Sequence, residues 1–242
     1  MSISKSGNYV IIVYEVGQRN KVLLTRKFFV YENRTSITVT PTNTMSNSNN
    51  DSHNQINFNV NQSLIGSTDP NNEFKVTVLQ NNNYENQQFY PPTYLGGNLL
   101  SYRGTKLNFE AGNEFRQFDT RNINLGSVGL GVYKSVYEAP FYHSILTPIQ
   151  SRKLNVYDQY TDHNGKRFVM AQSTKSSYNE TDYNWVYFYL DYPEADSTKA
   201  FYIWGELTNW EKLKIARLQY NESSKQYTGK LYLKQGVYDY AI

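Results

Sequence analysis

Short runs of alternating apolar and polar residues constrain the fold of this chain more than any other feature. Residues 55–60 read Gln-Ile-Asn-Phe-Asn-Val, and residues 73–80 read Glu-Phe-Lys-Val-Thr-Val-Leu-Gln. Alternation with a period of two places the apolar side chains on one face of a β-strand. The 3.6-residue period that an amphipathic helix requires is almost absent from the sequence. We therefore predict an all-β protein.

The strands expected from residue 151 onward are short and evenly spaced. Seven are predicted, at residues 154–160, 167–171, 185–190, 200–204, 213–220, 227–233 and 237–242. Seven strands at intervals of roughly 8–12 residues are typical of an immunoglobulin-like sandwich. We therefore expect tandem immunoglobulin-like or E-set-like β-sandwich units, with a boundary near residues 148–152.

Near the N-terminus, the pattern predicts a β-hairpin formed by residues 9–14 and 22–31. A lone hairpin is not stable in water, so these residues must belong to a larger sheet. We expect residues 1–32 to be either the end of a preceding β-domain or a part of the unit that follows. The expected domains are then 1–32, a central sandwich at 33–150 and a truncated C-terminal sandwich at 151–242.

Composition excludes several classes of function. The 242 residues contain no cysteine, which excludes a disulfide framework, a thiolate metal site and a thiol nucleophile. The three histidines, His53, His143 and His163, are too far apart in sequence to suggest a metal site. A net charge of +3 without a basic cluster argues against a nucleic-acid partner. No run reaches the ~18 apolar residues of a membrane helix, and Met1 is not followed by an export signal. We expect no metal or cofactor.

A charged cluster lies in residues 108–121. In an extended strand, Glu114 and Arg116 share one face, whereas Asp119 and Arg121 share the other. We predict that this cluster, together with Asn113, is structural and forms charge-assisted hydrogen bonds that fix the strand. The alternatives are a recognition surface or a catalytic carboxylate pair. No activated nucleophile or metal ligand accompanies the cluster, so the chain is not expected to be an enzyme.

Aromatic side chains supply two candidate binding regions. In residues 84–98, Tyr84, Phe89, Tyr90 and Tyr94 lie among prolines and glycines. Tyrosine-rich irregular segments offer contact area at a low entropy cost, which suggests partner binding. The asparagine-rich segment 42–54, predicted to be an exposed loop, is a second candidate for the same role. The alternative is that residues 84–98 pack across the end of their own sandwich.

The second aromatic region is residues 201–210, which read Phe-Tyr-Ile-Trp-Gly-Glu-Leu-Thr-Asn-Trp. Trp210 beside Asn209 on a polar turn could stack on a sugar while the amide bonds its hydroxyl groups. The alternative is that Trp204 and Trp210 are both core residues of a sandwich.

Residues 111–119, Ala-Gly-Asn-Glu-Phe-Arg-Gln-Phe-Asp, resemble the most characteristic stretch of the type IX secretion system plug protein family of Gram-negative bacteria. Further stretches resemble family motifs in the same order, namely residues 6–10, 24–28, 162–165, 181–186, 202–210 and 233–240. The resemblance spans nearly the whole sequence, which looks like a central fragment of such a protein.

This resemblance implies a role without catalysis. Such a protein is expected to be a plug that binds the periplasmic side of a large outer-membrane β-barrel translocon and closes it when no substrate passes. It implies a periplasmic protein associated with the outer membrane, with its export signal absent from this sequence. Its partner would be the translocon protein, and the chain itself is expected to be a monomer.

A second resemblance suggests a different function. Residues 202–210 followed by 234–240 are similar to glycogen- and starch-binding modules of the family-48 type. This similarity covers only about residues 184–242. It implies a carbohydrate-binding protein as the alternative, with Asn209 and Trp210 as the glycan ligands.

Overall fold

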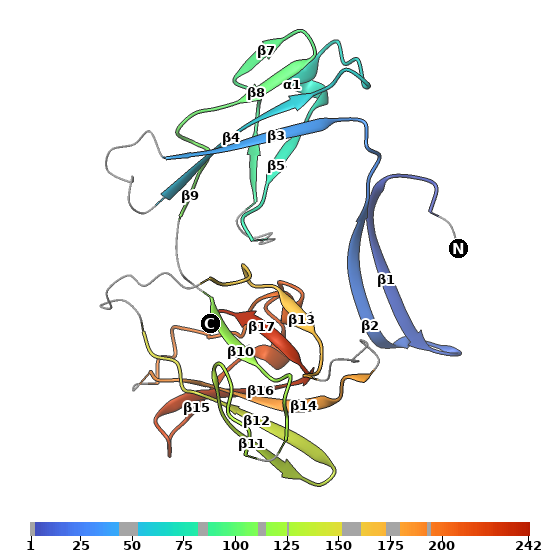
Figure 1. The fold of residues 1–242 in the computed structure, drawn as a ribbon. Coiled ribbons are helices and arrows are strands. Elements are labelled where there is room, and N and C mark those ends of the chain that lie inside the picture. Colours follow the sequence, from blue (N-terminus) through green and yellow to red (C-terminus); the bar gives the residue numbers. More distant parts are fainter. Residues whose placement is uncertain are drawn as a thin grey trace. The chain divides into compact units, whose positions relative to one another are not determined.

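The computed structural model describes residues 3–43, 53–81, 87–110, 115–124, 126–151, 161–172, 180–192 and 195–242 (Figure 1). These residues form mainly strands and turns. The helical elements among them are short: α1 (Pro70–Glu73), η3 (Glu206–Thr208) and η4 (Lys214–Ala216). The predicted all-β fold is thus confirmed. Within the described residues, no helix is long and apolar enough to span a bilayer.

The chain divides into two compact units, which are described separately. Unit 1 comprises residues 1–78 and 89–111, and unit 2 comprises residues 79–88 and 112–242. The predicted N-terminal hairpin forms in unit 1 from β1 (Gly7–Glu15) and β2 (Gln18–Val30). The two strands pair with each other and with no further described strand. Apolar side chains such as Ile12 and Leu23 therefore stay exposed.

The rest of unit 1 is built from two small sheets around one core. The larger sheet has the order β3 (Ser36–Asn43), β4 (His53–Asn61), β8 (Leu99–Tyr102) and β7 (Tyr94–Gly96), and β9 (Asn108–Glu110) also pairs with β4. The smaller sheet pairs β5 (Val76–Val78) with β6 (Gln88–Tyr90). Phe58, Val60 and Leu100 fill the core, and Val76 and Val78 of the smaller sheet pack against it.

Two expectations for unit 1 need correction. Residues 42–43 and 53–54, which were expected to be loop, extend β3 and β4. Thr42 pairs with Gln55 and Asn43 with Asn54, while His53 pairs with Glu110 of β9. Residues 44–52 lie outside the described residues. Pro41 does not end the strand, because β3 lies at the sheet edge, where a missing N–H is tolerated. A turn at 103–107 separates β8 from β9.

Unit 2 is a sandwich of two sheets. One sheet has the order β11 (Val132–Glu138), β12 (Phe141–Leu146), β14 (Tyr183–Leu190), β16 (Gln226–Lys234) and β15 (Gln219–Asn221). The other has the order β10 (Arg116–Asp119), β17 (Gly236–Tyr240) and β13 (Arg167–Val169). Phe118 and Tyr238 of the smaller sheet share one core with Val186, Phe188 and Leu231 of the larger sheet.

The domain boundary expected near residue 150 does not separate the two compact units. Strand β10 pairs antiparallel with β17, and β12 pairs in parallel with β14. The segment 116–146 is thus built into the same two sheets as residues 167–240, and the units divide near residue 111. Local sequence patterns could not show this, because the strands that pair lie far apart in the chain.

Two predicted C-terminal strands also differ from the structure, and a third is not described. The strand expected at 213–220 consists of η4 followed by the short β15, and residues 200–204 form only the isolated bridges Tyr202↔Arg217 and Trp204↔Ala241. The strand expected at 154–160 lies outside the described residues.

Candidate functional site

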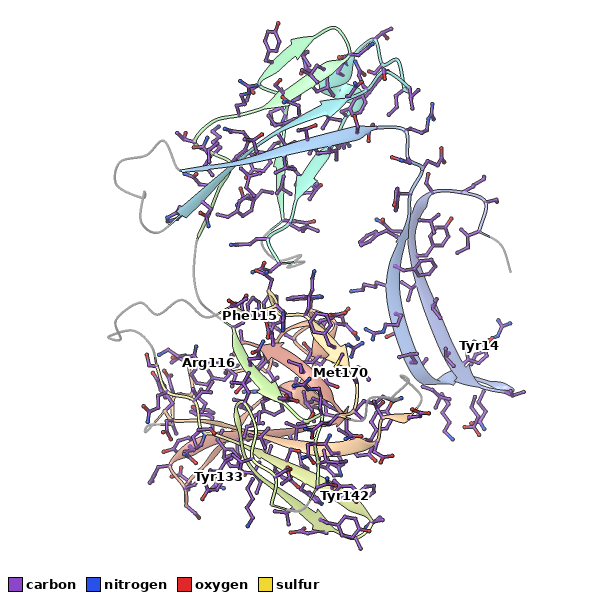
Figure 2. All side chains as sticks on the ribbon, viewed as in Figure 1. Tyr14, Phe115, Arg116, Tyr133, Tyr142 and Met170 are labelled. Carbon is purple, nitrogen blue, oxygen red and sulfur yellow. The ribbon has the colours of Figure 1, made fainter. Side chains whose placement is uncertain are left out.

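Four of the sequence motifs identified above meet within unit 2. Phe115 immediately precedes β10, as Figure 2 shows, and Gly165 ends the turn at 162–165. Trp204 and Trp210 come from the segment around η3, and Asp239 lies on β17. These five residues are called the motif cluster.

The rings of the motif cluster pack against one another. Phe115 is 3% exposed and stacks on Trp204 with a centroid distance of 6.0 Å and an interplanar angle of 12°. Trp210 contacts Phe115 edge-on at 6.4 Å and Trp204 at 5.0 Å. Gly165 leaves room for them, since a Cβ there would lie 2.5 Å from Trp210 Cη2 and 2.6 Å from Phe115 Cε1. The three rings and Gly165 therefore pack closely together, with Phe115 buried among them and both tryptophans partly buried.

Asp239 fixes the 162–165 turn against this core. Its carboxylate is completely buried and accepts hydrogen bonds from Gln117 Nε2 at 3.0 Å, from the backbone N–H of His163 at 2.5 Å and from that of Gly165 at 3.3 Å. A buried carboxylate is tolerated only when donors replace its lost hydration. Asp239 is thus a structural anchor for the turn.

Sequence reasoning missed Asp239, because the local pattern of β17 indicates an exposed side chain. Tyr238 and Tyr240 alternate with it on β17 and belong to the core, so Asp239 must point to the opposite face of its sheet. An acidic residue on such a strand is usually exposed to solvent, and only the packing of a distant turn buries this one.

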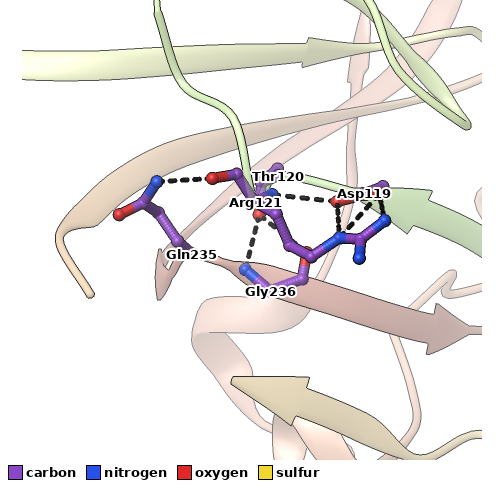
Figure 3. A network of polar contacts seen from close by, with 5 residues as sticks. All are labelled: Asp119, Thr120, Arg121, Gln235 and Gly236. Atoms are coloured by element: carbon purple, nitrogen blue, oxygen red, sulfur yellow. Dashed lines mark hydrogen bonds and ion pairs between the residues drawn. The ribbon is translucent and has the colours of Figure 1, made fainter. Parts of the chain in front are cut away.

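The end of β10 is tied to the start of β17 by a network of polar contacts (Figure 3). Asp119 and Arg121 form a bidentate ion pair with a closest distance of 2.6 Å, which raises the pKa of Arg121. Thr120 Oγ1 donates to the carbonyl of Gly236 at 3.2 Å. Gln235 Nε2 donates to the carbonyl of Arg121 at 2.8 Å. The Thr120 and Gln235 contacts link the two strands, whereas the Asp119–Arg121 pair is local to the end of β10.

The described residues of the charged cluster predicted from sequence contact two different segments. Arg116 donates through Nη2 to the carbonyl of Gln150 at 3.2 Å, on a different side of β10 from the Asp119–Arg121 pair. The other two residues of the predicted cluster, Asn113 and Glu114, lie outside the described residues.

A cleft of about 620 Å³ lies beside β10. Arg116 and Asp162 are the charged residues among the described side chains that line it. The described lining of the cleft thus contains one carboxylate, that of Asp162. Elsewhere in the described ranges, no three His, Asp or Glu side chains gather closely enough to hold a metal ion.

The structure does not favour the two residues expected to bind a glycan. Asn209 follows η3 in the left-handed conformation with φ 57°, and Trp210 continues it with φ 60°. The Trp210 ring is half-buried and directed into the motif cluster. A sugar-binding platform needs an exposed ring face, and the packing of Trp210 does not supply one.

The aromatic segment of unit 1 is partly exposed. Phe89 and Tyr94 are each 65% exposed. Tyr90 instead packs against the core of unit 1 and donates its hydroxyl to the carbonyl of Lys106 at 3.0 Å; burial raises its pKa. Tyr84 lies outside the described residues. Two of the four predicted partner-binding residues are therefore available to a partner.

Comparison with known proteins finds a family model that matches the N-terminal part of the chain. Residues 1–32, which contain the hairpin, match the family model described as type 9 secretion system plug protein 1st domain. The resemblance to the plug family is confirmed. Among curated proteins, none matches the chain.

Besides this match to the plug family, the chain is similar to a solved structure of a hypothetical protein from Parabacteroides merdae ATCC 43184. The two are 29% identical in sequence, with a TM-score of 0.87 over 98% of this chain. The chain spans 59% of that protein's chain.

Proposed function

We propose that this chain is a non-enzymatic plug of the type IX secretion system. It binds the periplasmic side of the outer-membrane β-barrel translocon and closes the barrel while no substrate passes. The match of residues 1–32 to the first domain of plug proteins carries this proposal. In this role the chain works as a monomer in the periplasm, next to the outer membrane.

The physical requirements of a plug agree with the fold. A stopper that cargo must displace needs a rigid body and an interface that can release, which means a polar surface with a few apolar anchors. Each unit has its own packed core, which can keep that unit rigid. Phe89 and Tyr94 supply exposed anchors on unit 1.

Affinity capture tests the proposed function. The tagged protein is incubated with outer-membrane extract, and the retained material is identified by mass spectrometry and by sugar analysis. The proposal expects the giant barrel of the translocon to be retained. Recovery of polysaccharide without the barrel would overturn it in favour of a carbohydrate-binding protein.

Replacing both Phe89 and Tyr94 with serine is expected to lower the retained barrel by about tenfold, which corresponds to about 1.4 kcal/mol of binding free energy. Because both side chains are exposed, the free energy of unfolding should change by less than about 0.5 kcal/mol. Quantitative capture at equal protein concentration measures the effect. Ile215→Ser is the control, since Ile215 is similarly exposed, at 68%, but lies on η4 of unit 2, outside the sheets. Equal capture by all three proteins would remove Phe89 and Tyr94 from the interface.

A further inference from the structure

The outer face of the five-stranded sheet in unit 2 carries a continuous group of aromatic and lysine side chains. On β14, Tyr183 and Trp185 point away from the core, whereas Asn184 and Val186 between them are buried. On the neighbouring β16, Lys234 pairs with Tyr183, Tyr232 with Trp185, and Lys230 with Tyr187. Figure 1 shows β12, β14 and β16 next to one another. The aromatic–lysine face is defined here as Phe141, Tyr183, Trp185, Lys230, Tyr232 and Lys234.

Tyr232 is the centre of this face. Its ring stacks on Tyr183 with a centroid distance of 5.1 Å and an interplanar angle of 22°. Trp185 lies 4.9 Å from it at a tilt of 40°, and Phe141 meets it edge-on at 5.8 Å. Rings held by their neighbours lose little conformational freedom when a partner binds, so the face is preorganised for docking.

The two lysines of the face lie over aromatic rings. Lys230 Nζ is 4.7 Å from the ring centroid of Trp185, and Lys234 Nζ is 5.4 Å from that of Tyr183. Such cation–π contacts hold the ammonium groups at defined positions. The sequences of β12, β14 and β16 contain no Asp or Glu. On the neighbouring edge strand β11, Lys134 and Glu138 share this face through their pairing with Ile145 and Phe141. The described charges of the face are thus three lysines against one carboxylate.

The exposed parts of the rings indicate which partner chemistry fits. Phe141, Tyr183 and Tyr232 are 40%, 48% and 43% exposed, and grouped apolar exposure of this kind marks interaction sites. Tyr183 and Trp185 each contact the ring of Tyr232, and a lysine ammonium lies over each of their rings. Ring edges carry partial positive charge. A sugar stacks on an open ring face, whereas carboxylates complement positive edges and ammonium groups.

We propose that the aromatic–lysine face is the docking surface for a protein partner that presents Asp and Glu carboxylates. This inference rests on the proposed function, in which the partner is the periplasmic side of the translocon barrel. Unit 2 then takes part in binding through this sheet, and its motif cluster serves to hold the sandwich together.

The test measures binding of the protein to the purified, detergent-solubilised barrel by surface plasmon resonance. The double variant Lys230→Glu, Lys234→Glu should bind at least about tenfold more weakly, because like charges then meet across the interface. Binding of the unaltered protein should weaken as NaCl is raised, since salt screens exposed charges. Lys214→Glu is the control, because Lys214 is an exposed lysine of the same unit on η4, outside the sheet. A milder variant, Lys230→Gln with Lys234→Gln, repeats the measurement should charge reversal disturb folding.

The outcomes separate this inference from the proposed function. If the unaltered protein does not bind the barrel, both the docking face and the proposed plug function are wrong. If it binds and both double variants bind equally well, the docking face is wrong while the plug function stands. Heparin serves as an anionic polysaccharide probe. Lysine-dependent retention on heparin, with barrel binding unaffected by the same substitutions, would assign the face to a glycan and overturn the proposal.

Discussion

Replacing Asp239 with alanine is expected to lower the free energy of unfolding of unit 2 by about 3–5 kcal/mol. The substitution removes the acceptor for Gln117 Nε2 and for the backbone N–H groups of His163 and Gly165, and it leaves these donors in a buried site. The chain has three tryptophans, and all lie in unit 2, at positions 185, 204 and 210. Urea unfolding followed by tryptophan fluorescence therefore reports on this unit selectively.

Two further variants make the Asp239 result specific. Asp182→Ala removes an exposed carboxylate from the same unit and should change the free energy of unfolding by less than about 0.5 kcal/mol. Asp239→Asn keeps the shape of the side chain and one acceptor oxygen. Its free energy of unfolding should therefore lie between those of Asp239→Ala and Asp182→Ala. A value for Asp239→Ala that matches the Asp182 control would show that the buried carboxylate does not hold the turn.

Gly131→Ala is expected to destabilise unit 2 by about 2–6 kcal/mol through two separate effects. Gly131 has φ +67°, a conformation that costs an alanine roughly 1–3 kcal/mol. A Cβ at this position would also lie 2.2 Å from the backbone oxygen of Gln117 and 3.1 Å from Phe118 Cα. Backbone cannot move aside as a flexible side chain can. The turn is held close to β10 by the hydrogen bond from Asp119 N–H to the carbonyl of Leu130 at 2.8 Å.

Gly126→Ala separates the two effects. Gly126 has a similar φ of +75°, but no heavy atom outside its chain neighbours lies within 4 Å of the Cβ it would gain. This variant should therefore show the conformational strain alone, and the difference between the two variants measures the clash. Tryptophan fluorescence during urea unfolding gives both values. Equal losses would mean that the turn at Gly131 can withdraw from β10 without cost.

The features that could be predicted from sequence are those with a local cause. Alternation over residues 55–60 is a property of one strand, and it correctly indicated β4. The hairpin β1–β2 follows from two adjacent runs and the turn between them. The pairing of β10 with β17 has no such local signal, because it depends on two segments that meet only in the folded unit. The boundary expected near residue 150 differed from the observed division for this reason.

The candidate sites show the same distinction. The motifs at 111–119, 162–165 and 202–210 were recognisable as motifs, but their meeting around Phe115 and Gly165 is a tertiary property. Phe89 and Tyr94 are exposed, whereas Tyr90 packs against the core. This difference depends on which face of each short strand meets the core. Of the aromatic–lysine face, the sequence predicted the strands but not the face itself. Its lysines lie on β16 and meet the rings of β14 only through strand pairing.

Strand β17 imposes an order on the folding of unit 2. It is the middle strand of its sheet, with β10 on one side and β13 on the other, yet residues 236–240 follow all the other strands of the unit. Until they emerge during synthesis, β10 and β13 have no partner and the ring of Phe118 has no Tyr238 to stack on. Pairing between such distant segments is slow to form. The sheet formed by β10, β17 and β13 consequently cannot be completed until synthesis has passed residue 240.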